Sequence, residues 1–203
     1  MIMADAKERS RTYFNLHRGS RLARGGYWRH DYRFSLEELA RLKPGELIDI
    51  GCGPGAFLCE VEKRFPEIRL SALDLSEEMI GVTRRRLRET AACTVGDAEH
   101  MPLASGQYDA VTCNMSIHHY PHPQDAVNEM YRILRPGGAL LLNDMDCVRP
   151  VRALANVVFP LLPGGDVKMY ERREIEHMLW NAGFRSARYR KISPFSFLCV
   201  AVK

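Results

Sequence analysis

The sequence lacks any closely spaced pair of cysteines, although six cysteines are scattered through its 203 residues. Without CxxC pairs or metal-finger spacing, these cysteines favour a reduced, intracellular chain, and we expect a cytoplasmic protein with no bound metal. Long apolar runs are missing too, because the most apolar window, residues 157–162, is short and contains Pro160. No membrane span is therefore predicted. The first ten residues are polar and do not resemble a signal sequence.

Charge of one sign is also scarce, since the formal net charge is only +4, and no segment is repeated or of low complexity. These absences exclude a disordered chain and a solenoid. With 46% hydrophobic residues, the chain is long enough to bury one sizeable core. We therefore expect a single globular domain.

The most informative stretch is a glycine-rich turn at residues 51–55, which follows a short apolar run at 46–50. This pattern predicts a strand, a tight loop and a helix that ends before Pro66. The three glycines lack Cβ atoms and tolerate positive φ angles, so the backbone can wrap closely around a ligand. A nucleotide-like ligand fits such a loop, and the next helix would point its free N-terminal amides at that ligand.

An acidic residue ends the next predicted strand, which covers residues 69–75. Ser76 is expected to cap the following helix, and Met79 lies on that helix's apolar face. Asp74 then lies beside the glycine loop, where a carboxylate can bind both hydroxyls of a ribose. Because Gly51, Gly53 and Ala56 also fit a relaxed dinucleotide fingerprint, the loop alone leaves a nicotinamide cofactor open.

Strands and helices alternate along the middle of the chain, which predicts an α/β fold with a doubly wound, largely parallel sheet. A final helix and two strands close the sequence. Beyond the elements above, the expected strands are at 93–95, 108–115, 139–143, 185–192 and 195–202, and the expected helices are at 35–42, capped by Ser35, and at 123–134 and 171–181.

Five segments of the sequence form a further pattern, at residues 47–55, 73–76, 96–103, 108–111 and 134–138. Taken in this order, they resemble the class I S-adenosylmethionine-dependent methyltransferases, and in particular the ubiquinone and menaquinone biosynthesis methyltransferases. The resemblance implies a Rossmann-like, seven-stranded sheet whose last strand is antiparallel. It also implies one methyltransferase domain over 1–203, with an N-terminal helical or lid segment (1–45), a cofactor-binding core (46–146), a variable substrate-side segment (147–170) and a closing helix with strands (171–203).

The resemblance assigns roles to residues at the ends of these segments. The three loop glycines would lie against the methionine part of S-adenosylmethionine, Asp74 would bind the ribose, and Asp97 would accept a hydrogen bond from the adenine amino group. The cofactor-binding residues that it implies are Asp49, Gly51, Cys52, Gly53, Gly55, Asp74, Leu75, Met79, Gly96, Asp97, Ala98, Asn114 and Met115. Residues 96–99 and 135–138 argue against a nicotinamide dehydrogenase.

Catalysis leaves little trace in such a sequence, because a sulfonium methyl is already activated and the protein mainly has to position a nucleophile. A base is needed only if the nucleophile must lose a proton early. The candidates are His118 and His119, with Tyr120, Asp144 and Asp146 as further possibilities, although packing at the pocket rim would also explain the histidines. Histidine spacing does not predict a metal site.

The acceptor is left open by the sequence. Residues 1–33 carry seven arginines and one lysine against three acidic residues, interleaved with aromatics such as Tyr27 and Trp28. This segment could be a solvated segment that packs on the domain, a lid, or a nucleic-acid contact. Residues 147–170 could form an apolar wall beside the substrate or a helix packed on the sheet edge, and of the two we expect packing. We expect a small organic acceptor and release of S-adenosylhomocysteine, with an RNA or protein methyltransferase and a non-catalytic S-adenosylmethionine-binding protein as alternatives.

Overall fold

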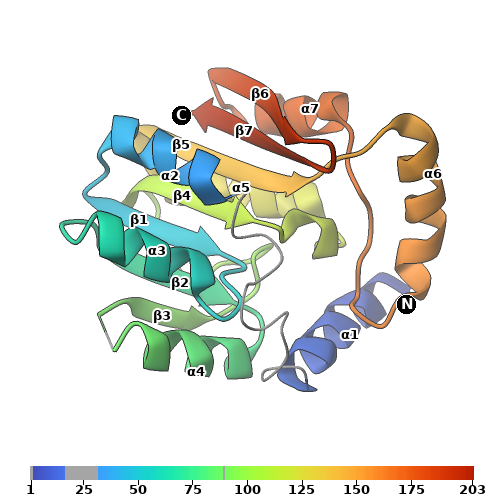
Figure 1. Cartoon of the computed structure of the whole chain (residues 1–203), viewed down its shortest axis with the longest axis horizontal. Coiled ribbons are helices and arrows are strands. Elements are labelled where there is room, and N and C mark those ends of the chain that lie inside the picture. The colour runs from blue at the N-terminus through green and yellow to red at the C-terminus, as the bar shows by residue number, and fades with distance from the viewer. Residues whose placement is uncertain (1, 17–31, 89) are drawn as a thin grey trace.

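A seven-stranded sheet forms the centre of the molecule, in the order β3-β2-β1-β4-β5-β7-β6 (Figure 1). The computed structural model describes residues 2–16, 32–88 and 90–203. The strands are β1 (Glu46–Ile50), β2 (Arg69–Asp74), β3 (Ala92–Val95), β4 (Tyr108–Asn114), β5 (Leu134–Met145), β6 (Ser186–Ser193) and β7 (Ser196–Val202). From β3 to β5 all pairings are parallel, whereas β7 is antiparallel to both β5 and β6. The predicted fold class is therefore confirmed.

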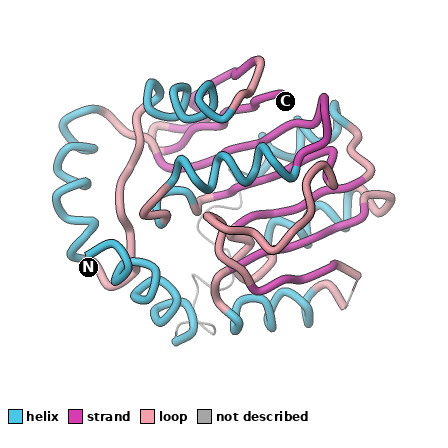
Figure 2. The backbone as a smooth tube through the Cα atoms, turned by 180° about the vertical axis from the view of Figure 1, so that it is seen from behind, coloured by secondary structure: helices cyan, strands magenta, loops and turns pink. Residues whose placement is uncertain are grey.

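Helices cover both faces of this sheet (Figures 1 and 2). They are α1 (Ile2–Leu16), α2 (Tyr32–Leu42), α3 (Ala56–Arg64), α4 (Glu77–Arg86), α5 (Pro123–Ile133), α6 (Arg149–Val158) and α7 (Arg172–Ala182), with short 3₁₀ turns η1 (Ile117–His119) and η2 (Phe159–Leu161). Apolar residues of α5 and α7 form one core with the sheet, and those of α2, α3 and α4 form the other. In β1, Leu47 belongs to the second core and Ile48 to the first, because neighbouring strand residues face opposite sides.

Local signals fix several helix ends as the sequence predicts. The Ser76 hydroxyl accepts a hydrogen bond from the Met79 amide at 3.1 Å, which caps α4. At α7, Glu171 and Glu174 form a reciprocal capping box. The helix ends at Gly183, whose φ of 103° is in the left-handed region that glycine favours.

Two expected boundaries are wrong. Helix α2 begins at Tyr32, so Ser35 lies inside it, fully buried, with its hydroxyl 3.4 Å from Asn114 Oδ1 instead of at a cap. Strand β5 already begins at Leu134, because Tyr108 pairs with Leu134 before the register shifts and Ala110 pairs with Ala139. Residues 135–138, which separate the expected helix 123–134 from the expected strand 139–143, thus form an irregularity within a longer strand.

Helix α6 also departs from expectation, since none of its residues is buried and it does not pack on the sheet edge. Leu154 and Val157 are 67% and 70% exposed, and Leu161 just after the helix is 79% exposed. Figure 1 shows α1 and α6 beyond the ends toward which β1, β4 and β5 point. The expected aromatic contacts of Tyr27 and Trp28 lie outside the described residues. Within the described part of the chain, no helix has both the length and the apolar character needed to cross a membrane.

Candidate active site

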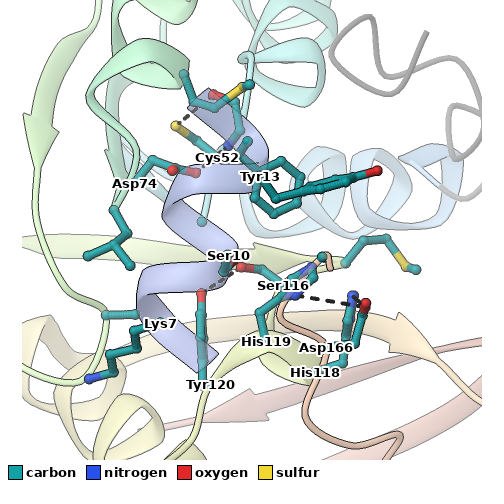
Figure 3. Close-up of a pocket in the computed structure, with 18 of the residues that line it drawn as sticks. Lys7, Ser10, Tyr13, Cys52, Asp74, Ser116, His118, His119, Tyr120 and Asp166 are labelled. Atoms are coloured by element: carbon teal, nitrogen blue, oxygen red, sulfur yellow. Dashed lines mark hydrogen bonds and ion pairs between the residues drawn. The ribbon is translucent and has the colours of Figure 1, made fainter. Parts of the chain in front are cut away.

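A cavity of about 520 Å³ opens at the carboxyl ends of β1, β2 and β4 (Figure 3). This edge of an open parallel sheet is where ligands generally bind. All but two of the predicted cofactor residues line the cavity: Gly51, Cys52, Gly53, Asp74, Leu75, Met79, Gly96, Asp97, Ala98, Asn114 and Met115. The two candidate catalytic residues, His118 and His119, line it as well. The structure thus brings residues from four separate loops onto one wall.

The glycine loop is shaped by what lies on each side of it. Gly51 has a φ of 67°, and a Cβ there would lie 1.9 Å from Ser116 Oγ and 2.8 Å from the Tyr120 hydroxyl. Gly51 is therefore required for the segment after β4 to close on the loop. Gly53, by contrast, has a φ of 51° and open space where a Cβ would be. That space belongs to the cavity, so Gly53 leaves room for a ligand against the backbone.

Asp74 ties the loop to the end of β2. One of its carboxylate oxygens accepts a hydrogen bond from the Gly53 amide and the other from the Ser76 amide, both at 2.8 Å. Burial raises the pKa of Asp74, and the two backbone hydrogen bonds partly offset that rise. The carboxylate is therefore held in one orientation on the cavity wall, beside the loop.

Asp97 lies further along the same wall and contacts the N-terminal helix. Its Oδ2 is 2.7 Å from Lys7 Nζ, and the same ammonium group is 2.5 Å from Glu99 Oε2. Burial lowers the pKa of Lys7, but the hydrogen bonds and charges of Asp97 and Glu99 raise it overall. Helix α1 is thereby anchored across the cavity, and in Figure 3 it passes in front of the wall that carries Asp74 and Tyr120.

Two predicted cofactor residues lie behind this wall rather than on it. Asp49 is 2% exposed and accepts hydrogen bonds from Thr112 Oγ1 at 2.7 Å and Asn114 Nδ2 at 3.1 Å. Burial raises the pKa of Asp49 to about 7. Gly55 precedes α3 with a φ of 72°, and a Cβ there would lie 2.8 Å from the Thr83 side chain. Asp49 is thus tied to β4, Gly55 lies against α4, and neither residue lines the cavity.

The histidines follow β4 on the turn η1. His118 Nδ1 is 2.7 Å from Asp144 Oδ1, and Asp144 Oδ2 accepts the Ser116 amide at 3.0 Å. Burial lowers the pKa of His118, but the charge of Asp144 and its hydrogen bond raise it overall. Burial and the neighbouring charge of His118 hold the pKa of His119 well below its usual range. Of the other base candidates, Tyr120 lines the cavity. Asp146 does not line it and instead forms an ion pair with Arg152, with 3.1 Å between Asp146 Oδ1 and Arg152 Nη1.

Comparison with known proteins decides the family. Residues 48–142, which include the glycine loop, Asp74 and Asp97, match the methyltransferase domain family. This match identifies a methyltransferase domain within residues 48–142. The resemblance expected from the five sequence segments is confirmed, and S-adenosylmethionine is the cofactor that this class uses.

Two curated relatives and one solved structure illustrate the likeness of this methyltransferase domain. It is 40% identical over 94 residues to a malonyl-[acyl-carrier protein] O-methyltransferase of Enterobacter lignolyticus, covering 46% of this chain and 36% of that protein. It is 34% identical over 106 residues to a ubiquinone/menaquinone biosynthesis C-methyltransferase of Cereibacter sphaeroides, covering 49% and 42%. The chain therefore matches less than half of the length of either relative.

The solved structure extends the likeness to most of the chain. A Haloferax volcanii protein, solved in complex with a methyltransferase activator, superposes with a TM-score of 0.78 at 19% identity and covers 93% of this chain and 96% of that one. At this identity the match shows the fold alone. The shared fold thus includes the elements on both sides of residues 48–142.

Sequence reasoning did not single out two residues of this cavity, Ser10 on α1 and Asp166 in the loop after η2. Phe14, Phe159 and Leu162 also line it, and they lie in the segments 1–33 and 147–170, of which the second was expected on the substrate side. Helical periodicity in residues 1–16 and the glycine pair before Asp166 were the available signals. Neither signal says which part of the sheet a segment packs against, and that contact is what makes these residues part of the site.

Proposed function

We propose that this chain is a cytoplasmic S-adenosylmethionine-dependent methyltransferase that transfers a methyl group to a small organic acceptor and releases S-adenosylhomocysteine. The observation that carries the proposal is a single cavity with Asp74 and Asp97 at one part of its wall and His118 and His119 at another. The first pair suits an adenosyl group, and the second faces the space left for an acceptor. A single domain over residues 1–203 fits this arrangement.

The cofactor part of the cavity is suited to a sulfonium. Carboxylates of Asp74 and Asp97 are on its wall, and Asp49 lies just behind it. A positive ligand is favoured in such surroundings. We propose that Asp74 binds the ribose hydroxyls, that Asp97 accepts from the adenine amino group, and that the backbone at Gly51 and Gly53 lies against the methionine part. Asp49 and Gly55 would then act through the loop rather than by contact.

Apolar side chains line the acceptor part. Phe14 from α1 and Phe159, Leu162 and Pro163 from the segment after α6 enclose it. Elements that cover the cavity in this way favour a small acceptor over a nucleic acid or a protein. Since no disulfide joins its six cysteines, the chain also suits a reducing compartment such as the cytoplasm.

The part of the cavity wall that carries His118 and His119 is the place where an acceptor proton would be removed. Asp144 fixes the ring of His118 through Nδ1, which leaves Nε2 directed toward Asp166. A positioned imidazole with a carboxylate partner is a usual arrangement for proton transfer from a hydroxyl or an acidic carbon. We propose that His118 and His119 contact the acceptor and assist its deprotonation.

The test of this function is isothermal titration with S-adenosylmethionine, S-adenosylhomocysteine and NAD, followed by measurement of S-adenosylhomocysteine release with phenols, carboxylic acids and amines. We expect both adenosyl compounds to bind. Asp74→Asn should weaken that binding by about 1–3 kcal/mol, because a charged hydrogen-bond acceptor is lost. Asp125→Asn, at an exposed position on α5, is the matched control and should leave affinity unchanged.

Each rival has its own signature in these experiments. Binding of NAD without binding of either adenosyl compound would indicate that the glycine loop is that of a nicotinamide dehydrogenase. Binding of S-adenosylmethionine without turnover of any acceptor would indicate a non-catalytic binding protein. Methylation of RNA with an affinity that falls steeply with salt would replace the small acceptor by a nucleic acid.

A further inference from the structure

Three side chains that the proposed cofactor contacts do not use converge at the acceptor part of the cavity. The ring nitrogens of His118 and His119 and a carboxylate oxygen of Asp166 lie within 4.8 Å of one another. Figure 3 shows these three side chains gathered together to the right of the lower part of helix α1. Two imidazoles and a carboxylate are a donor set that binds zinc and related divalent cations.

The separations between these atoms match a shared ion better than direct hydrogen bonds. His118 Nε2 is 3.5 Å from Asp166 Oδ1, and His119 Nδ1 is 3.8 Å from the same oxygen. Hydrogen bonds of this kind are about 2.7–3.2 Å long. Bonds of about 2.1 Å to one tetrahedral ion place two ligand atoms about 3.4 Å apart. Small rotations of the side chains would bring all three donors to that spacing.

The surroundings of His118 suit a metal ligand. Its Nδ1 is 2.7 Å from Asp144 Oδ1, and its Nε2 is on the side of Asp166, 3.5 Å from Oδ1. With a cation bound at Nε2, Nδ1 would donate its proton to the Asp144 carboxylate. A carboxylate that orients a histidine in this way is the usual outer partner of a histidine bound to zinc.

His119 supplies an independent observation. Its Nδ1 is buried and has no hydrogen-bond partner, and the ring packs edge-on against Phe14 at 5.4 Å between centroids. A buried polar atom without a partner is costly and calls for an explanation. A bound cation would satisfy this atom in the direction in which Asp166 already lies.

The loop that carries Asp166 is held in place from two sides. The amides of Val167 and Lys168 donate to the His118 carbonyl at 2.7 and 3.3 Å. Gly165, with a φ of 73°, lies so close to α1 that a Cβ would be 2.7 Å from the Ala6 carbonyl oxygen. Because of these contacts, Asp166 is directed at the histidines by backbone structure.

We propose that His118, His119 and Asp166 bind one divalent cation of the zinc type, which keeps an open position toward the acceptor. This metal site rests on the proposed function only for its role, in which the two histidines would assist deprotonation as ligands of the cation instead of taking the proton themselves. There, an acceptor hydroxyl oxygen would occupy the open position and lose its proton to water more readily. The oxygen's electron pair would form the bond to the methyl carbon, and the pair of the breaking carbon–sulfur bond would stay on the sulfur of S-adenosylhomocysteine.

The test is a titration of the full chain, free of affinity tag and treated with chelator, with Co²⁺ as a spectroscopic probe. We expect saturable binding of one ion, with visible absorption of low-symmetry Co²⁺ and no thiolate charge-transfer band. His119→Gln and Asp166→Asn should each weaken binding at least tenfold. His177→Gln, which removes an exposed histidine from α7, should bind like the unaltered chain.

Equal Co²⁺ affinity in all four proteins, or no saturable binding, would overturn the metal site. If His119→Gln fails to fold, Asp166→Asn decides the outcome, since the Asp166 side chain is partly exposed. The titration uses neither S-adenosylmethionine nor an acceptor. Loss of the metal site with intact cofactor binding would therefore leave the methyltransferase proposal standing, and metal binding without cofactor binding would refute that proposal alone.

Discussion

Lys7 Nζ lies 2.7 Å from Asp97 Oδ2, which joins the first helix of the chain to the carboxylate proposed to bind adenine. The same ammonium group is the counter-charge of Glu99, whose side chain is 1% exposed. One cation on α1 is thus shared by two carboxylates beside the cavity and offsets only part of their combined negative charge.

Replacement of this cation should destabilise the domain. In Lys7→Met the buried Glu99 carboxylate loses its charged partner, so the free energy of unfolding should fall by about 1–3 kcal/mol. Urea denaturation followed by circular dichroism measures the change. Arg11→Met on the same helix, whose partner Glu8 is exposed, serves as control and should unfold like the unaltered chain. A Lys7→Met protein as stable as this control would show that the contact is dispensable.

Removal of residues 1–31 should impair cofactor retention and turnover while the sheet still folds. Helix α1 supplies Ser10 and Phe14 to the cavity wall, whereas both cores are built from residues after position 31. Circular dichroism would report the fold, and titration with S-adenosylhomocysteine would report retention. Unchanged affinity and turnover would mean that α1 is not a lid.

The glycine loop offers a paired substitution. Gly51→Ala should unfold the domain more readily than Gly53→Ala, because only the first Cβ collides with Ser116 and Tyr120. At Gly53 the cost to stability should be limited to the left-handed backbone, about 1–2 kcal/mol. Its Cβ would nevertheless enter the cavity, so cofactor affinity should fall. Denaturation and titration of both variants would separate the two effects, and equal stability losses would contradict the described packing.

Asp49 should make stability depend on pH. Its pKa is about 4 in an unfolded chain and about 7 in the folded protein, so the folded state holds the proton more tightly. The resulting stability is fully present below pH 4 and is lost as the pH rises to 7, by an amount on the order of 4 kcal/mol. Denaturation at a series of pH values should show a shallower decline for Asp49→Asn. Parallel curves for the two proteins would disprove the pKa assignment.

The sequence predicted the parts of the fold that local patterns encode. Strand β1, the glycine loop and the Ser76 cap each depend on residues within a few positions of one another. Ser35 shows the limit of such reasoning, because its polarity and position suggested a cap, whereas contact with Asn114 places it inside α2. Only the packing of distant segments distinguishes the two outcomes.

The site divides in the same way. Asp74 and Asp97 end predicted strands or begin the loops after them, so their place at the sheet edge followed from topology. Asp49 and Gly55 belong to the same motif, yet neither lines the cavity. Asp49 is directed into the protein by the alternation of side chains along β1, and Gly55 by the turn that precedes α3. Asp166 was not foreseen, because its approach to His118 depends on a loop held between η1 and α1.

The position of β6 at the border of the sheet has a consequence for the behaviour of the protein in concentrated solution. A border strand presents unpaired backbone groups to which another molecule could add a strand. β6 carries Arg188, Arg190 and Lys191, and the opposite border, β3, has only four residues. Long charged side chains along one border strand and the shortness of the other should keep copies of this protein from joining edge to edge.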